Sequence, residues 1–425
     1  MFDLRRIREL DERLGGPSRS LRCVHVAGTK GKGSTCHMLS SIFTAAGYRT
    51  GLFTSPHLVD VEERIQVDNT PIAPADFAEL IGEVADPAEA MRARGEADSP
   101  TFFEMLTECA FLHFVRQGVD LAVIEVGLGG RLDSTNIVSP LVSVVTEIGI
   151  DHRAELGDTI EQIAREKCGI VKPGAPVVAS TTQPIALEIV RQFAAERGAP
   201  LTVAHERLHA SAVDLEGLDT SFRIDELDLD CRLPLVGEHQ VRNALCAAAV
   251  CEVLAERGKV VVPPAKLAEG LAGVRLEGRF SLYGGSGPDD PLVVADVAHN
   301  PLSVATMLAT WHRRLAGRRF VLLFAASGDK DVEGMLSLLA PLAEAAVLTK
   351  ACSPRSKPLE ELEPIARGAG LDAIVCDDST AAYNRAITLA REKGLPLLVT
   401  GTFYLVGEVL RLRKTGVANP HLVGR

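Results

Sequence analysis

The sequence predicts an α/β protein with two domains. Short, largely apolar runs rich in β-branched residues alternate with helical patterns in two separate parts of the chain. A chain of 425 residues also exceeds one ordinary core, since a domain takes about 100 to 200 residues. A third observation is the segment 28–35, GTKGKGST, which lies between a strand-like and a helix-like run. We predict domains at 1–274 and 275–425.

The first domain has the pattern of a parallel sheet buried on both faces. Its apolar runs are Val24–Ala27, Leu121–Val126, Leu141–Ile150 and Val177–Ser180. Helical patterns lie around them at Ser34–Ala46, Pro74–Arg94, Phe102–Gln117 and Thr159–Ile170. From about Leu201 to Leu235 charged and apolar residues alternate, which predicts a small antiparallel sheet before an alanine-rich helix from about His239.

The second domain begins after the helical pattern stops in GVRLEG, residues 273–278, and a turn-rich segment follows. Its predicted strands are Leu292–Val297, Phe320–Ala325, Ala346–Thr349, Ala373–Cys376 and Leu397–Thr400. Helical patterns between these strands predict a Rossmann-like order, although the sequence has no G-x-G-x-x-G fingerprint.

Composition excludes several classes of protein. The formal charge of -11 argues against a nucleic-acid or membrane-surface binder. The nine cysteines are scattered without a C-x-x-C pair, unlike a disulfide framework or a zinc site. The N-terminal residues have no apolar leader, and no stretch approaches about 20 apolar residues. We therefore expect a cytoplasmic protein.

Segment 28–35 has the composition of a phosphate-binding loop. Glycines let backbone N–H groups turn towards an anion, the following helix N-terminus adds partial positive charge, and Lys32 can reach the terminal phosphates. Gly33 separates Lys32 from Ser34, so the loop is a variant, G-x-x-G-K-G-S, of the common G-x-x-x-x-G-K-S/T form. The alternative is a glycine- and lysine-rich turn that only connects the strand to the helix and binds no ligand. The strand before it and the helix after it favour phosphate binding.

Polar residues stand at the ends of three apolar runs, where ligands of open parallel sheets gather. They are Glu125, Asp151 with His152, and Ser55 with Pro56 and His57. Mg²⁺ prefers hard oxygen ligands and holds substrate phosphates through one or two carboxylates, so Glu125 and the Ser34 hydroxyl make a suitable pair. Taken singly, these residues could instead be a paired strand carboxylate, a capped turn and a surface histidine, and histidine is a less usual ligand of Mg²⁺.

Further polar residues lie in helices and in the second domain. For Lys167, in the helical IAREKCGIVKPG, the residues alone favour a solvated lysine on the outer face. Asn243 interrupts an apolar helical face and needs a partner, which a ligand or ordinary capping could supply. Asp296 and His299 end a strand of the second domain, and Arg279 falls just beyond the proposed hinge. The two domains would then face one cleft.

Eleven short motifs, in this order, resemble folylpolyglutamate synthase and dihydrofolate synthase, the folate branch of the Mur ligase superfamily of ATP-dependent amide-forming enzymes. The resemblance spans nearly the whole chain. The motifs are HVAGTKGKGST, TSPHL, SPTFFEMLT, EVGLGGRLDSTN, TEIGIDH, IAREKCGIVK, LVGEHQVRNA, GRF, DVAHNP, SGDKD and GTFYLVGEV. The resemblance implies a P-loop ATPase domain of Mur ligase type, with a small antiparallel sheet, and a Rossmann-like glutamate-ligase domain.

The resemblance also implies roles for individual residues. ATP would be held by Gly31, Lys32, Gly33 and Ser34, with Asn243, Arg279 and Asp296 from across the two domains. Two Mg²⁺ ions would be held by Ser34, Ser55, Glu125, His152 and Lys167. Family members carry the lysine at this last position as a carbamate, an oxygen ligand, which reverses the preference for a solvated lysine. The pterin would lie near Phe102, Phe103 and Asp133, and the incoming glutamate near His299 and Thr402.

Departures from the family pattern are few. Many relatives have Asn in place of Lys30, Gly in place of Val297, and Ser in place of Thr402, which keeps the hydroxyl. None of these differences removes a proposed ligand or charge.

The chemistry that the resemblance implies is transfer of the ATP γ-phosphoryl group to a carboxylate, followed by attack of the glutamate amine on the acyl phosphate. Lys32, Glu125, His152 and Lys167 would serve this chemistry, and closure about 274–279 would exclude water. The implied partners are ATP, L-glutamate, reduced folates and dihydropteroate, with the protein a monomer. One alternative is a Mur-type ligase acting on a UDP-linked cell-wall precursor. The other is a GTPase, whose N-K-x-D segment is absent.

Overall fold

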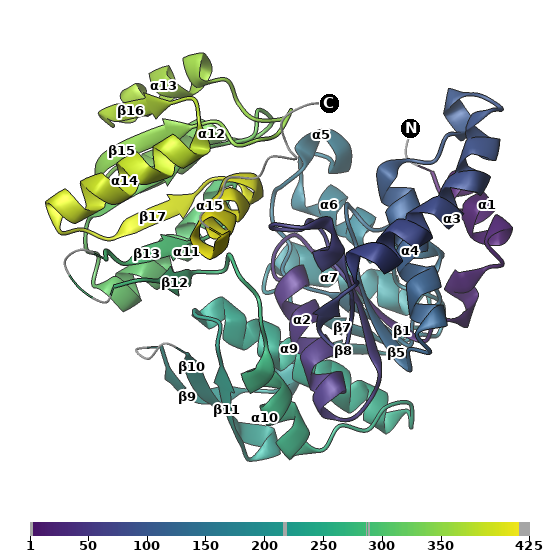
Figure 1. The fold of residues 1–425 in the computed structure, drawn as a ribbon. Coiled ribbons are helices and arrows are strands. Elements are labelled where there is room, and N and C mark those ends of the chain that lie inside the picture. Colours follow the sequence, from purple (N-terminus) through teal and green to yellow (C-terminus); the bar gives the residue numbers. More distant parts are fainter. Residues whose placement is uncertain (1–2, 216–218, 286, 288–289, 416–425) are drawn as a thin grey trace.

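A computed structural model describes residues 3–215, 219–285, 287 and 290–415. The chain forms two lobes, one from the purple to teal segments and one from the green to yellow segments (Figure 1). Each lobe contains a sheet of mainly parallel strands, and a small antiparallel sheet adjoins the first. The two-domain α/β fold that the sequence predicts is confirmed. The boundary between 274 and 275 stays a prediction.

The first sheet of the described residues has eight strands in the order β4-β3-β2-β5-β1-β6-β7-β8. Strands from β2 to β8 in this order run parallel, while β3 and β4 pair antiparallel at one edge. Their bounds are β1 Cys23–Ala27, β2 Thr50–Phe53, β3 Ile65–Val67, β4 Thr70–Pro71, β5 Leu121–Glu125, β6 Val142–Val145, β7 Val177–Ala179 and β8 Leu201–Val203. The predicted run Leu141–Ile150 is longer than β6 because its last residues form a loop at the carboxyl edge.

Helices cover both faces of the first sheet, because successive strand side chains point to opposite sides. In β5, Leu121 and Val123 share a core with α2 and α9, whereas Ala122 and Ile124 pack in the core that contains α3 and α4. The helices of this lobe are α1 Arg5–Arg13, α2 Lys32–Ala45, α3 Pro74–Arg92, α4 Phe102–Arg116, α5 Arg153–Leu156, α6 Ile160–Cys168, α7 Pro184–Glu196, α8 Ala204–Arg207, α9 Glu238–Glu256 and α10 Pro264–Gly273.

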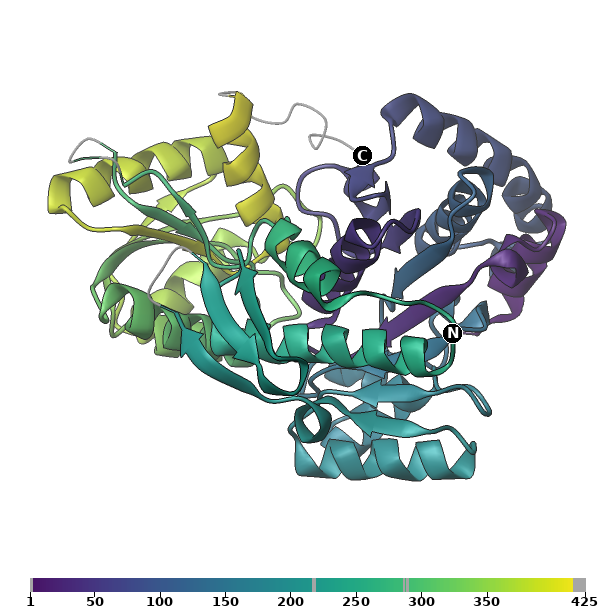
Figure 2. The ribbon, with the colours of Figure 1, turned by 90° about the horizontal axis from the view of Figure 1, so that it is seen from below.

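The antiparallel sheet is smaller than the sequence indicates. It contains β9 Ala210–Asp214, β10 Thr220–Ile224 and β11 Leu229–Leu233. The prediction that this sheet begins near Leu201 is wrong, since β8 joins the edge of the first sheet in parallel with β7. After β8 the chain turns through the short helix α8 before β9 begins the antiparallel sheet. Figure 2 shows the antiparallel sheet beside the long helix α9.

The second domain has the predicted strands and one more. Its sheet has the order β12-β13-β17-β14-β15-β16, parallel except for β12. The bounds are β12 Ser281–Tyr283, β13 Val293–Ala295, β14 Phe320–Phe324, β15 Ala343–Thr349, β16 Ala373–Cys376 and β17 Leu397–Thr400. The helices are α11 Pro301–Leu315, α12 Val332–Leu339, α13 Leu359–Gly368, α14 Ser379–Lys393 and α15 Phe403–Thr415. Alternate residues of β14 contact α11 and α12 on one face and α14 on the other.

Two further expectations concern cysteines and membranes. All nine cysteines are free, and seven of them are buried. Among the helices that the structure describes, none combines the length and the apolar character needed to cross a bilayer.

Glu108, on α4, is a buried carboxyl group whose two oxygens lack a hydrogen-bond partner. Burial, together with nearby Asp11, raises its pKa well above the usual value. The folded protein therefore binds this proton more tightly than the unfolded chain does, and stability falls as pH rises from about 4.3 to the folded pKa. We expect Glu108→Gln to raise the melting temperature at about pH 8 and to change it little at about pH 4.

Thermal unfolding at both pH values measures this effect. Glu12→Gln, on the exposed face of α1, is the control. An equal shift at both pH values would show that the carboxyl charge is not responsible.

Candidate active site

The phosphate loop connects β1 to α2, as the sequence predicts. Its backbone is tied to the segment after β6, because Thr29 N and Lys30 N donate to Glu147 O at 2.8 and 3.0 Å. Gly31 is the N-cap of α2 with φ 86°, a left-handed conformation that favours glycine. A Cβ at Gly31 would lie 2.5 Å from Asn243 Oδ1, so glycine also lets α9 approach the loop.

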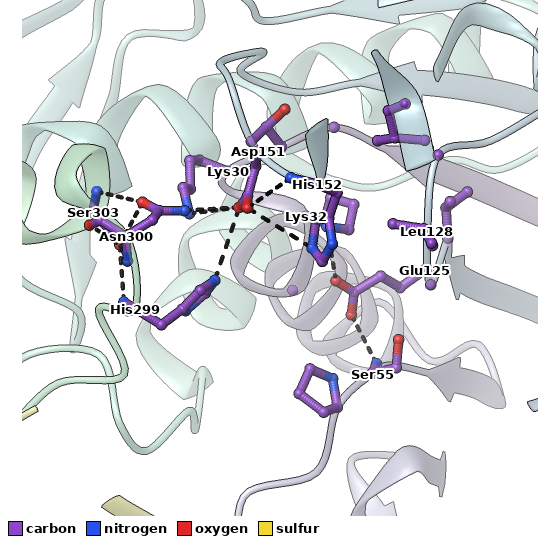
Figure 3. Close-up of a pocket in the computed structure, with 18 of the residues that line it drawn as sticks. Lys30, Lys32, Ser55, Glu125, Leu128, Asp151, His152, His299, Asn300 and Ser303 are labelled. Carbon is purple, nitrogen blue, oxygen red and sulfur yellow. Dashed lines mark hydrogen bonds and ion pairs between the residues drawn. The ribbon is translucent and has the colours of Figure 1, made fainter. Parts of the chain in front are cut away.

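Glu125, at the end of β5, points at this loop (Figure 3). Its side chain is buried, Oε2 accepts from Ser55 N at 3.1 Å, and Oε1 lies 3.9 Å from Lys32 Nζ. A Cβ at Gly33 would lie 3.6 Å from Oε2, which puts the carboxylate against the first turn of α2. Burial raises the pKa of Glu125, although Lys32 opposes the shift. A cation beside this carboxylate would offset its desolvation.

The predicted magnesium ligands lie around the same cleft. Ser34 is buried in the first turn of α2, and Ser55 follows β2. His152 is the N-cap of α5, with φ 51° and a side chain that is 41 % exposed. Among the described residues, no three His, Cys, Asp or Glu side chains form a metal cluster. Hydroxyl and carboxylate oxygens suit Mg²⁺, and the Glu125 carboxylate has lone pairs beyond the one that accepts from Ser55 N. The group formed by Ser34, Ser55 and Glu125 therefore fits the ion.

Lys167 is buried near the end of α6, with only 5 % of its surface exposed. The interpretation as a solvated lysine is therefore wrong. Burial, and then the charge of Lys32, lower its pKa to about 7. Its Nζ has neither a hydrogen bond nor an ion pair to another described residue. Helix α6 packs so closely on the loop after β5 that a Cβ at Gly130 would lie 2.8 Å from Lys167 O.

The residues of α9 and of the second domain that are predicted to bind ATP line the same cleft as the phosphate loop. Asn243 Nδ2 donates to Gln240 Oε1 at 3.0 Å, which answers the question of its partner. Asp296 accepts from Phe280 N and Ala298 N at 2.9 and 2.8 Å. The Arg279 guanidinium lies 5.2 Å from the centre of the Phe403 ring.

The two phenylalanines predicted to lie near the pterin, Phe102 and Phe103, have different environments. Phe102 is 61 % exposed at the cleft, whereas Phe103 packs against Phe53 with ring centres 5.8 Å apart. A Cβ at Gly127 would lie 2.5 Å from Phe103 Cζ, so Phe103 supports the loop after β5. Phe102 is therefore the more exposed of the two rings, although both line the cleft.

Asp133 organises the same loop from within. Its Oδ2 accepts from Leu128 N at 2.8 Å, and its Oδ1 accepts from Thr135 N and Thr135 Oγ1. The Thr135 hydroxyl lies 2.8 Å from Nε2 of the fully buried His25 on β1. Because the hydroxyl donates its one proton to Asp133, His25 Nε2 must be the donor in this pair. The hydrogen-bond chain joins the strand before the phosphate loop to Asp133.

The two residues predicted to bind the incoming glutamate, His299 and Thr402, lie in the second domain. His299 Nδ1 donates to Val297 O at 2.8 Å, which leaves Nε2 facing Asp151 at 3.9 Å. Partial burial lowers the pKa of His299 to about 3, so the ring is neutral. Thr402 is buried before α15, and its Oγ1 accepts from Tyr404 N at 3.3 Å.

Sequence reasoning missed three basic residues of the cleft. Arg64, after β2, donates to His57 Nδ1 at 2.9 Å and lies 5.8 Å from the Phe102 ring centre. Lys30 and Lys330 both pair with Asp151. The position of Lys330 just after the apolar run of β14 is a signal that could have identified it, but nothing local distinguishes Arg64.

All of the predicted site residues line one cleft of about 2290 Å³ between the lobes. It brings together the phosphate loop, the carboxyl ends of β2, β5 and β6, the start of α9, and the loops after β13 and β17. Such an arrangement can hold a nucleotide and align a second molecule with its phosphates.

Comparison with known proteins agrees with this geometry. The Mur ligase middle domain family matches residues 26–251, and the Mur ligase glutamate ligase domain family matches residues 278–403. A dihydrofolate synthase/folylpolyglutamate synthase of Bacillus subtilis is 34 % identical over 97 % of this chain and 95 % of its own length.

Solved structures agree as well. Mycobacterium tuberculosis folylpolyglutamate synthase complexed with ADP and AMPPCP superposes with a TM-score of 0.89 at 30 % identity, covering 98 % of this chain and 96 % of its own. E. coli FolC in complex with DHPP and ADP gives 0.84 at 31 % identity, covering 98 % and 94 %. The cell-wall alternative is not favoured by these relatives. The chain belongs to the folylpolyglutamate synthase/dihydrofolate synthase family of Mur-type ligases.

Proposed function

We propose that this protein uses ATP to join L-glutamate to the carboxylate of a reduced folate, and of dihydropteroate to form dihydrofolate. The observation that carries the proposal is the single cleft in which the phosphate loop and buried Glu125 face His299 and Thr402 of the second domain. Similarity to folate ligases over nearly the whole chain supports the substrate class. Because one chain supplies every proposed residue, we propose a monomer.

The proposed reaction needs alignment and charge neutralisation rather than a protein nucleophile. Lys32 and the N-terminus of α2 would hold the γ-phosphoryl group while the acceptor carboxylate attacks it and ADP leaves. The glutamate amine would then displace phosphate from the acyl phosphate to form the amide. Closure of the lobes about 274–279 would protect the acyl phosphate from water.

Mg²⁺ would supply further positive charge at the transferred phosphate. Ser34, Ser55 and Glu125 would hold one ion. His152 and a carbamate on Lys167 would hold a second. Burial of an unpartnered Lys167 supports this proposal, since carbamate formation requires the neutral amine.

We expect Lys167→Ala to lower turnover by about 10²-fold or more, as for loss of one preorganised charge-stabilising group. Protein incubated with isotope-labelled bicarbonate should show a carbamate signal by NMR, absent in the variant. Lys32→Ala should keep that signal. A wild-type protein without the signal, and with unchanged turnover in carbon-dioxide-free buffer, would exclude the carbamate.

The hydrogen-bond chain from His25 through Thr135 to Asp133 predicts that a change at His25 alters the KM for the pterin-bearing acceptor alone. We expect His25→Leu to raise the KM for the pterin-bearing acceptor about tenfold, because it removes the donor that Thr135 needs. His25→Gln, which can donate from a similar position, should recover most of the loss. Steady-state kinetics would test this, and an equal rise in the KM for ATP would indicate general disruption instead.

The test of the proposed function is ADP release with ATP, Mg²⁺ and glutamate, comparing dihydropteroate with a reduced monoglutamyl folate and identifying products by mass. Gain of one glutamyl unit on both acceptors supports the full proposal, and gain on one narrows it. No glutamate-dependent ADP with either acceptor would overturn it.

A further inference from the structure

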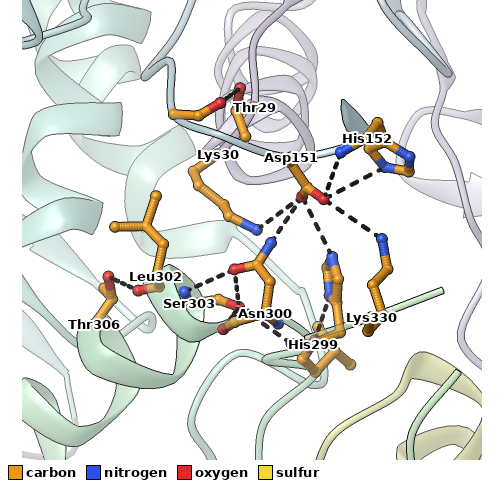
Figure 4. Close-up of polar contacts among 12 residues, drawn as sticks. Thr29, Lys30, Asp151, His152, His299, Asn300, Leu302, Ser303, Thr306 and Lys330 are labelled. Carbon is orange, nitrogen blue, oxygen red and sulfur yellow. Dashed lines mark hydrogen bonds and ion pairs between the residues drawn. The ribbon is translucent and has the colours of Figure 1, made fainter. Parts of the chain in front are cut away.

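The Asp151 carboxylate is a meeting point of the two lobes (Figure 4). It belongs to the loop after β6, next to His152, and four side chains converge on it from elsewhere. Three of them carry donor groups, which are Lys30 Nζ at 3.5 Å, Lys330 Nζ at 3.4 Å and Asn300 Nδ2 at 2.7 Å. The fourth is the neutral His299 ring, whose unprotonated Nε2 lies 3.9 Å away. Lys30 comes from the phosphate loop, and the other three come from the second domain. The cluster therefore joins the nucleotide side of the cleft to the second lobe.

The contacts of Asp151 differ in strength. Asn300 donates at an ordinary hydrogen-bond distance, whereas both lysines lie at the outer limit of an ion pair. Asp151 is the ion-pair partner of Lys30 among the described residues, while Lys330 also pairs with the exposed Asp329. Either ammonium group could move to a new anion without breaking a short hydrogen bond.

The backbone under this cluster is well fixed. Lys30 N donates to Glu147 O, Thr146 Oγ1 donates to Lys30 O at 2.8 Å, and Thr29 Oγ1 donates to Gly149 O at 3.1 Å. The loop that carries Lys30 and the segment that leads to Asp151 are thus held in register. Only the side chains of Lys30 and Lys330 need to move to accept a ligand.

The order of charges is complementary to an acidic amino acid. One carboxylate lies between two ammonium groups, and side-chain exposures of 24, 13 and 9 % for Lys30, Lys330 and Asp151 mark a partly buried site. Free glutamate has the opposite order, one ammonium group between two carboxylates. We propose that Asp151 binds the α-ammonium of the incoming glutamate, while Lys30 and Lys330 move from Asp151 to its two carboxylates.

This inference rests on the proposed function, because it concerns the amino acid of the same reaction. It makes Asp151 and Lys30 recognition residues. It also explains how the second lobe can sense the amino acid, since Asn300, the N-cap of α11, donates a hydrogen bond to the same carboxylate.

The test compares glutamate with glutarate, which has the two carboxylates but no ammonium group. Asp151→Asn should raise the KM for glutamate about tenfold or more, yet leave the inhibition constant of glutarate unchanged or lower. Lys30→Asn should raise the KM for glutamate and the inhibition constant of glutarate by similar factors. Neither variant should change the KM for ATP by more than about twofold. Lys259→Asn, at an exposed lysine outside the cleft, is the control.

If Asp151→Asn raised the KM for glutamate and the inhibition constant of glutarate by the same factor, the ammonium assignment would be overturned. An unchanged KM for glutamate would overturn it as well. Failure of glutarate to compete with glutamate in the wild-type protein would overturn the lysine assignment. A wild-type protein that releases no glutamate-dependent ADP would instead count against the proposed function.

Discussion

Lys32→Ala is expected to lower turnover by about 10³-fold or more, the scale on which cations contribute to phosphoryl transfer. Lys32 begins α2, where its ammonium group adds to the positive helix terminus. Its side chain is 18 % exposed and points into the cleft, 3.9 Å from Glu125. An alanine leaves the backbone of the loop intact but removes the charge that would neutralise the transferred phosphoryl group. Turnover measured as glutamate-dependent ADP release gives the effect.

The expected loss lies in turnover rather than in folding. Alanine is the best helix former, so α2 should persist and the melting temperature should stay close to that of the wild type. Lys259→Ala removes an exposed lysine of the same lobe and should be neutral. A folded Lys32→Ala protein with wild-type turnover would rule out the assignment.

Glu125→Gln is the second large effect, with an expected loss of about 10²- to 10³-fold in kcat/KM, as for several kcal/mol of lost metal stabilisation. The amide keeps the shape of the side chain and can still accept from Ser55 N. It lacks the negative charge that would bind Mg²⁺, so half-saturation in a magnesium titration should move to higher concentration. Activity measured across that titration separates weaker metal binding from a slower reaction.

The same substitution should stabilise the ligand-free protein. Burial raises the pKa of Glu125, so its ionised form opposes folding above the unfolded pKa of about 4.3. We therefore expect a higher melting temperature near neutral pH without metal, with activity lost. Glu108→Gln is the matched control, because it removes a buried carboxyl group away from the cleft and should keep activity. A Glu125→Gln enzyme with an unchanged magnesium requirement would contradict the proposed role.

Local pattern was sufficient for most of the fold. The run Phe320–Phe324 is apolar at every position, as a strand buried on both faces must be, and its side chains alternate between two cores. The phosphate loop was equally predictable, because the glycines, the lysine and the following helix are adjacent in the chain. The short strands β3, β4 and β12 were not predictable, since each has two or three residues and, unlike β7 and β13, does not lie in a longer apolar run.

Distant packing decided the burial and the partners of residues that the sequence had already singled out. The helical pattern around Lys167 shows which residues share a face, but the loop at Gly130 that packs against its backbone is about 37 positions away in the chain. Asp151 shows the same limit, because its partners come from the phosphate loop and from the second domain.

By itself, the sequence determined the strands, the helices, the phosphate loop and the family, because these depend on neighbouring residues and on motif order. Only the tertiary structure decided that β8 joins the first sheet, that Lys167 is buried, that Phe103 supports a loop, and that Asp151 gathers Lys30 and Lys330. The physical reason is that desolvation and ion pairing depend on which distant segments pack together. A side chain's burial and partners are set when the lobes assemble.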